Sequence, residues 1–132
     1  MQFIYNNHPV SITSVEKLRQ QLDRARQQQF SEVWLDSGDE GPILAMLVNG
    51  PHAWLMYLRD RQGDPGFSSR NPHYTGSAQA TMQFILSNGE MDEYPVAWTI
   101  RLEEAFAAFE YFLLSQGGRS PALVWHDDSQ PG

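Results

Sequence analysis

The chain has 132 residues, a net charge of −7 from 16 acidic and 9 basic residues, and no cysteine. This length fits one domain with its own core, and the lack of cysteine excludes disulfides and thiolate metal sites. No apolar run approaches the roughly 20 residues of a membrane-spanning helix, and no signal-peptide pattern opens the chain. We therefore expect one cytoplasmic domain over residues 1–132, with an ordered core to about residue 128 and a polar tail over 129–132.

The charge is distributed unevenly along the chain. Eight acids and two bases between Glu90 and Asp128 give that segment a net charge of −6, whereas four of the nine bases lie between Lys17 and Arg26. Phosphate backbones repel an acidic domain, so we expect no direct nucleic-acid binding, while a basic protein would be attracted. The same charge also serves simply to keep a protein soluble.

The N-terminal third predicts a strand and then a helix. Residues Phe3–Tyr5 favour a short strand, which the polar sequence over 6–9 ends. Thr13 and Glu16 have the spacing of a capping box at a helix N-terminus. The helix then carries an apolar stripe with a spacing of three to four residues, formed by Val15, Leu18, Leu22 and Ala25.

Three strands are predicted next, at Val33–Leu35, Ile43–Val48 and Ala53–Leu58. The second of these is apolar throughout, which is typical of a strand covered on both faces. The sequence GDPGFSSRNPHYTG over residues 63–76 follows, with two prolines and three glycines. Those residues favour turns, so we expect an ordered loop without helix or strand.

A hairpin, a helix and a short strand complete the chain. Alternating residues over 82–98 surround Asn88-Gly89, which favours a type I′ turn. A helix is expected over Leu102–Ser115, ended by a left-handed cap at Gly117-Gly118, and a strand over Ala122–Trp125. The element order predicts an α+β domain, with a mainly antiparallel sheet of about six to seven strands and two amphipathic helices packed on one face.

The sequence offers no convincing catalytic or metal-binding motif, and we expect no cofactor and no metal. His126-Asp127-Asp128 is either a metal or acid–base cluster or a charged strand end. Neighbouring strand residues point to opposite faces, so all three do not easily converge. Asp92-Glu93 is either a carboxylate pair or the solvent side of an edge strand.

Two further features have both a functional and a structural interpretation. The four tryptophans fall on predicted strands, where core packing is the default, although one or two at strand ends would suit a partner interface. Long ordered loops are often functional. Alternatively the loop is architectural, with Phe67 in the core and Arg70 paired with an acid such as Asp64.

Four segments in sequence carry a resemblance to a known family. The run GDPGFSSRNP, then LSNGEMDEYP, a helix ending in FLLSQGGRSP, and ALVWHDD together resemble immunity protein family one. These small bacterial proteins neutralise polymorphic and interbacterial toxins. The resemblance covers about residues 30 to 128 and implies a protein without enzymatic activity. It would bind the C-terminal domain of a cognate toxin, often a deaminase-fold toxin acting on nucleic acids.

The resemblance, the acidic C-terminal half and the loop together predict a monomeric antitoxin that binds a toxin domain. The residues expected to contact the partner or support the contact are Asp64, Phe67, Ser69, Arg70, Asp92, Glu93, His126, Asp127 and Asp128. Two alternatives remain open. One is a small metal-dependent hydrolase that uses His126 and nearby acids, and the other is a general regulatory interaction module.

Overall fold

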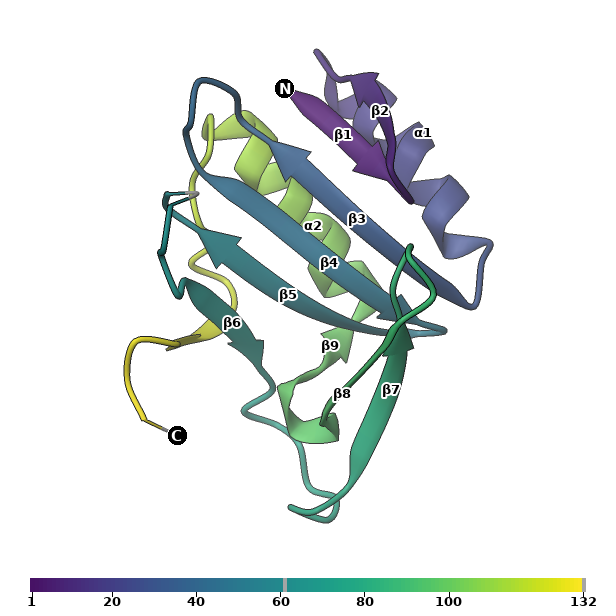
Figure 1. Ribbon diagram of the computed structural model, residues 1–132, viewed down its shortest axis with the longest axis vertical. Coiled ribbons are helices and arrows are strands. Elements are labelled where there is room, and N and C mark those ends of the chain that lie inside the picture. The colour runs from purple at the N-terminus through teal and green to yellow at the C-terminus, as the bar shows by residue number, and fades with distance from the viewer. Residues whose placement is uncertain (61, 132) are drawn as a thin grey trace.

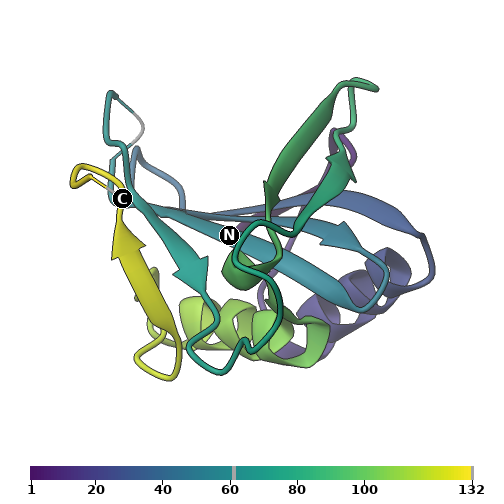
Figure 2. The same cartoon turned by 90° about the horizontal axis from the view of Figure 1, so that it is seen from below.

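A computed structural model describes residues 1–60 and 62–131, so the predicted tail over 129–132 ends outside the described residues. One twisted sheet forms the centre, with two helices on one face and a hairpin standing out from the other (Figures 1 and 2). No helix in the described part of the chain is long and apolar enough to cross a membrane. The helices cover one face of the sheet, and the hairpin stands over the other (Figures 1 and 2).

The main sheet has the order β10-β6-β5-β4-β3-β1-β2. The short strand β9 lies off this path and pairs with β5, as β6 does. The pairings between its described strands are antiparallel. This confirms the predicted α+β class, with more strands than expected. The strands are β1 (Gln2–Tyr5), β2 (His8–Ser11), β3 (Phe30–Asp36), β4 (Ile43–Asn49), β5 (His52–Leu58), β6 (Phe67–Arg70), β9 (Ile100–Arg101) and β10 (Val124–Asp127).

The helices α1 (Val15–Arg26) and α2 (Leu102–Leu114) build the main core with the sheet face that they cover. On α1 the buried positions are Leu18, Leu22 and Ala25, as the stripe predicts. On α2 they include Phe106, Phe109 and Phe112, and the helix packs against β4 and β5. Burial of these side chains, each worth roughly 1.5–3 kcal/mol, fixes the helices to this face.

Helix ends differ from the predicted caps by one or two residues. Ser14, and not Thr13, caps α1, because its hydroxyl accepts a hydrogen bond from the amide of Lys17. At the end of α2 the left-handed backbone starts at Gln116, with φ of 60°, and continues through Gly117. The amide of Gly117 then donates to the carbonyl of Phe112, which satisfies one of the last helical acceptors.

Three strands were not predicted: β2, β6 and the two-residue β9 just before α2. β2 follows a turn in which Asn6 and Asn7 both have positive φ. The chain therefore reverses direction after β1 and continues as a second strand paired with it. β6 lies inside the segment 63–76, which is therefore not free of strand. It joins β5 to β10 and makes this segment part of the sheet.

The predicted hairpin is confirmed as β7 (Thr81–Ile85) and β8 (Met91–Pro95), which form a separate two-stranded sheet. Its turn differs from type I′, since Gly89 has a φ of 88° but Asn88 is not in the left-handed region. A 3₁₀ turn, η1 (Val96–Trp98), leads from β8 to β9. The hairpin thus leaves the main sheet and returns to it beside β5.

Candidate functional site

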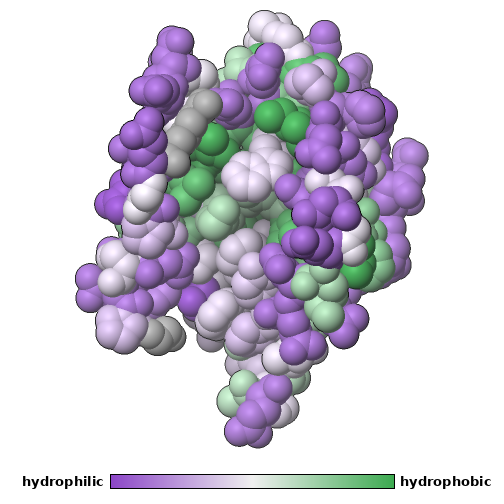
Figure 3. Space-filling view, in the orientation of Figure 1, coloured by the Kyte–Doolittle hydropathy of each residue, from purple (hydrophilic) through white to green (hydrophobic). Residues whose placement is uncertain are grey.

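The sheet face opposite the helices, which we call the open face, is the leading candidate site. One row of paired residues crosses it from β1 to β10. Its members are Ile4, Trp34, Ala45, Met56, Ser68 and His126. Figure 3 shows this side of the molecule, with apolar side chains gathered in a hollowed centre and hydrophilic side chains around it. Register therefore places an apolar strip, from Ile4 to Met56, beside a polar border at Ser68 and His126.

The hairpin overhangs this strip and is held to it by a small second core. Phe84 of β7 is buried against Leu47 and Trp54 of the main sheet. The ring of Tyr94, on β8, stacks on the ring of Trp54 at a centroid distance of 4.2 Å. Aromatic pairs of this kind add roughly 0.5–1.5 kcal/mol beyond their burial.

A hollow of about 160 Å³ lies between the hairpin and the sheet. Its lining is mostly apolar, with two carboxylates, and three strands of the main sheet, β3, β4 and β5, contribute to it. The lining residues are Glu32, Trp34, Ala45, Leu47, Trp54, Met56, Leu86, Asp92 and Tyr94. We refer to these residues together as the hollow. The indole N–H of Trp54 is buried there and has no hydrogen-bond partner among the described residues.

Glu32 is fixed in this hollow by three hydrogen bonds. Its carboxylate accepts from the indole N–H of Trp34 at 2.7 Å and from the amide and hydroxyl of Ser87 at 2.9 and 3.0 Å. Burial alone would raise the pKa of Glu32, but these hydrogen bonds outweigh it and lower that pKa. The group is therefore a fixed negative charge at neutral pH.

Asp92 supplies a second carboxylate from the hairpin. It accepts a hydrogen bond from the hydroxyl of Tyr94 at 3.1 Å. Burial, followed by the charge of Asp92 and this hydrogen bond, raises the pKa of Tyr94 to about 12. Tyr94 therefore stays a neutral donor to the carboxylate of Asp92, which lies beside the aromatic rings.

At the β6–β10 edge of the open face, four polar side chains meet. The hydroxyl of Ser68 donates to Asp128 at 2.9 Å and accepts from the guanidinium of Arg70 at 2.9 Å. His126 lies 3.9 Å from the same carboxylate of Asp128. Arg70 also stacks on Trp98, with its Cζ atom 3.9 Å from the ring centroid, and burial lowers its pKa despite the charge of Asp128. These four side chains form one compact group, although Ser68 and Asp128 are 60 residues apart in the sequence.

Asp127 and Glu93 lie apart from the two groups described above. Asp127 is paired with Phe67 in register, so it takes the sheet face opposite to that of His126. Its carboxylate accepts from the hydroxyl and amide of Ser129 at 2.6 and 3.0 Å, and these bonds lower its pKa. Glu93 is exposed on the side of the hairpin facing away from Asp92.

The three remaining predicted residues have structural contacts in or beside β6. Asp64 accepts from the amide and guanidinium of Arg59, and it is Arg59, not Arg70, that forms its ion pair, at 2.9 Å. Phe67 packs against the main core, and both Arg59 and Arg119 stack on its ring. Ser69 is fully buried and therefore supports the open face without forming its surface.

Ser69 joins three parts of the molecule through one hydroxyl. It accepts from the amide of Leu55 at 3.0 Å and donates to the carbonyl of Trp98 at 2.9 Å. Along β5, the residues before Leu55 pair with β9 and those after it pair with β6. The hydroxyl of Ser69 binds the amide of Leu55 between these two pairings. It thereby ties the base of the hairpin to the sheet.

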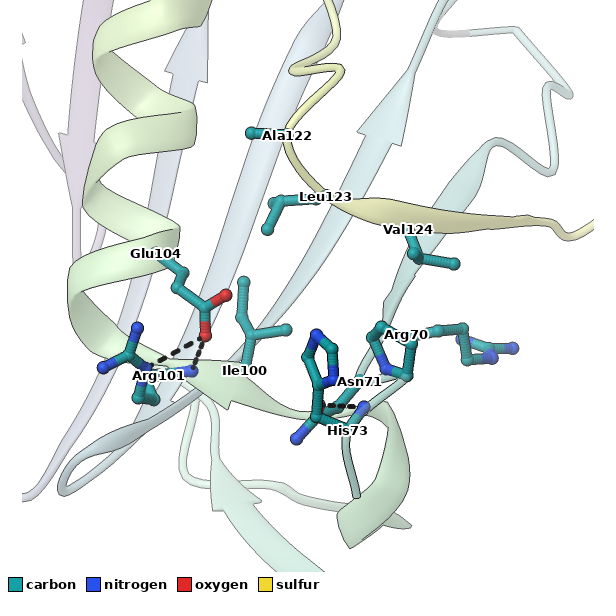
Figure 4. Close-up of a pocket in the computed structure, with 10 residues that line it drawn as sticks. Arg70, Asn71, His73, Ile100, Arg101, Glu104, Ala122, Leu123 and Val124 are labelled. Atoms are coloured by element: carbon teal, nitrogen blue, oxygen red, sulfur yellow. Dashed lines mark hydrogen bonds and ion pairs between the residues drawn. The ribbon is translucent and has the colours of Figure 1, made fainter.

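A second pocket, of about 350 Å³, lies beside the N-terminus of α2 (Figure 4). His73 and Glu104 point toward it, whereas the guanidinium of Arg70 points away. Glu104 is already engaged, because it accepts from the amide and guanidinium of Arg101 at 3.1 and 3.3 Å. The carboxylate of Glu104 is thus held at the end of α2 by Arg101.

The polar side chains at the β6–β10 edge bear on the metal and acid–base alternatives for His126-Asp127-Asp128. In residues 1–60 and 62–131, no group of three or more His, Asp and Glu side chains is placed to hold a metal ion. The Nε2 atom of His126 lies 3.2 Å from the carbonyl oxygen of Gln130, and Ser68 bonds directly to Asp128, not to His126. No hydroxyl in this group is thus paired with an imidazole base.

Comparison with known proteins adds no relative to this description. No protein-family model and no curated protein matches the chain. The hollow itself was missed by sequence reasoning, which named only Asp92 of its residues as an expected contact. For Trp34 and Trp54 it took core packing as the default and did not choose which tryptophans would suit an interface. Tyr94 was not singled out, and Glu32 carried no signal beyond its place beside a tryptophan-containing strand.

Proposed function

We propose that this protein is a cytoplasmic immunity protein, which binds a cognate bacterial toxin domain and neutralises it. The toxin we propose is one that acts on nucleic acids, such as a deaminase. The observation that carries the proposal is the open face, where aromatic and aliphatic side chains lie half-exposed within a polar border. Aromatic residues at the centre and polar ones at the rim are the usual arrangement of a protein interface.

Charge supports the same kind of partner. The chain carries −7, and the open face includes the carboxylates of Glu32, Asp92 and Asp128. A toxin that holds DNA or RNA needs a basic cleft. An acidic face would be steered toward that cleft and would compete with the nucleic acid for it.

The sequence resemblance to immunity protein family one supports the choice of a toxin as the partner. Two of the segments that carry it, around residues 63–72 and 122–128, form β6 and β10, at one border of the open face. A third, around residues 86–95, forms the tip and second strand of the overhanging hairpin.

A co-expression experiment tests this function. The C-terminal domain of the protein encoded immediately upstream is induced in a test bacterium, with and without this chain. We expect growth to stop without the chain and to resume with it, and the two proteins to co-purify at equal stoichiometry. Equal killing in both cases, or a domain that is harmless alone, would overturn the proposal.

A further inference from the structure

The hollow combines two features that point to one kind of ligand. Its walls include the aromatic rings of Trp34, Trp54 and Tyr94, and its charged groups are the carboxylates of Glu32 and Asp92. Aromatic faces attract cations through the ring quadrupole. Carboxylates bind the same cations by charge-assisted hydrogen bonds. We propose that the hollow receives a lysine or arginine side chain of the partner protein.

The described residues supply no cation to the hollow. Among residues 1–60 and 62–131, no basic side chain lies within 4.0 Å of the carboxylate of Glu32 or Asp92. Arg70, a basic residue of the open face, is committed to Ser68, the carbonyl of Ser69 and the ring of Trp98. Within the described part of the chain, the two carboxylates of this mostly apolar site therefore have no paired base.

Both carboxylates keep acceptor capacity for a guest. An ionised carboxylate offers about four lone-pair positions. Glu32 uses three of them, with Trp34 and Ser87, and these bonds hold it in place. Asp92 accepts one hydrogen bond, from Tyr94. A cation entering the hollow would find acceptors already oriented, which reduces the ordering cost of binding.

Other guests fit the hollow less well. An anionic group would be repelled by both carboxylates. A purely apolar side chain would remove their hydration without replacing it, which costs free energy. A lysine or arginine places its aliphatic stem against Met56 and Leu86 and its charged head against the acids. The hollow, with a volume of about 160 Å³, thus suits one long basic side chain.

This inference rests on the proposed function for the source of the side chain, but its test uses the protein alone. The probe is n-butylguanidinium, which carries the charge and stem of arginine. The matched control is n-butylurea, which has nearly the same shape and no charge. Binding is followed by two-dimensional ¹H–¹⁵N NMR, in which the chain's four tryptophans provide four indole N–H signals.

We expect saturable shifts of the Trp34 and Trp54 indole signals with n-butylguanidinium, and an apparent Kd at least about tenfold lower than for n-butylurea. Glu32→Gln should weaken the guanidinium complex about tenfold and leave the urea unchanged. Asp92→Asn gives a second variant that leaves the bonds of Glu32 intact. Glu103→Gln, on the exposed surface of α2, is the control and should bind like the wild type.

Equal affinity for the two probes, or no saturable shift of the Trp34 and Trp54 signals, would overturn the inference. So would unchanged guanidinium binding in both Glu32→Gln and Asp92→Asn. None of these results depends on a toxin, so they are separable from the co-expression experiment. If rescue fails but the probe binds in a charge-selective way, the proposal of a toxin partner is rejected. The inference that the hollow binds basic side chains is then retained.

Discussion

The indole ring of Trp54 and the phenol ring of Tyr94 lie nearly parallel, with an interplanar angle of 9°. Trp54 belongs to the main sheet and Tyr94 to the hairpin, so this stack is one of the contacts that join the two sheets. It also builds one wall of the hollow, so stability of the hairpin and shape of the site depend on the same contact.

Loss of that ring should therefore loosen the hairpin. We expect Tyr94→Ala to lower the free energy of unfolding by about 2–4 kcal/mol, since a large ring and its stacking are removed together. Tyr94→Phe keeps the ring and loses only the hydrogen bond to Asp92, so it should cost about 1 kcal/mol or less. Urea unfolding followed by circular dichroism measures both. Equal losses in the two variants would contradict a role for the stack.

Gly66 sits at the entrance to β6, where the backbone has no room for a side chain. Its φ is 76°, and an added Cβ atom would lie 2.5 Å from the carbonyl oxygen of Tyr57. Gly63 has a similar φ of 77° but open space around it. We expect Gly66→Ala to destabilise by about 2–4 kcal/mol and Gly63→Ala by about 1 kcal/mol. Similar melting temperatures for the two variants would argue against the close approach of β5 and β6.

Stability should fall in acid in a way that depends on Glu32. The pKa of the Glu32 carboxyl group is lower in the folded state than in the unfolded state. Its contribution to folding stability is therefore complete above its unfolded-state pKa and is lost as the pH falls through its folded-state pKa. We expect Glu32→Gln to be less stable than the wild type by about 1 kcal/mol at pH 7. The two stability curves should converge as the pH falls through the lowered folded-state pKa of Glu32. A constant difference between pH 7 and pH 2 would show that the charge is not responsible.

The acids of the open face should govern the rate of association with a basic partner. We expect Asp92→Asn/Asp128→Asn to lower the association rate constant several-fold at low salt and to flatten its dependence on ionic strength. Glu93→Gln/Asp127→Asn removes the same charge from positions off this face and should have the smaller effect. Stopped-flow mixing with the toxin domain measures both. The electrostatic part of the proposed function fails if the rate and its salt dependence stay unchanged.

The sheet and helices were largely predictable because their burial is periodic. The stripe of α1, the apolar run of β4 and the alternation of the hairpin all appear in the sequence with the correct spacing. β6 was not predictable in this way, since its central residues are two buried serines between turn-forming glycines and prolines. Its strand pairing comes from its neighbours and not from its own hydrophobicity.

The candidate site was predictable only in part. Strand alternation correctly separated Asp127 from His126, but no local pattern shows that Ser68, Arg70 and Asp128 meet across two strands. The hollow depends on long-range geometry, because Glu32 and Ser87 are 55 residues apart and Trp34 looks like any core aromatic. Such a site becomes visible only when the hairpin is placed over the sheet.

The central claim is that the open face binds the partner. Isothermal titration calorimetry of a catalytically inactive toxin domain against the wild type, Trp34→Ala and Tyr111→Ala tests it most directly. Tyr111 is the matched aromatic control, 41% exposed on α2 on the other side of the sheet. We expect Trp34→Ala to raise Kd at least about 30-fold, as for an interface hot spot, and Tyr111→Ala to leave it unchanged. Unchanged binding by Trp34→Ala, with a loss in Tyr111→Ala, would place the interface on the helices and contradict the account.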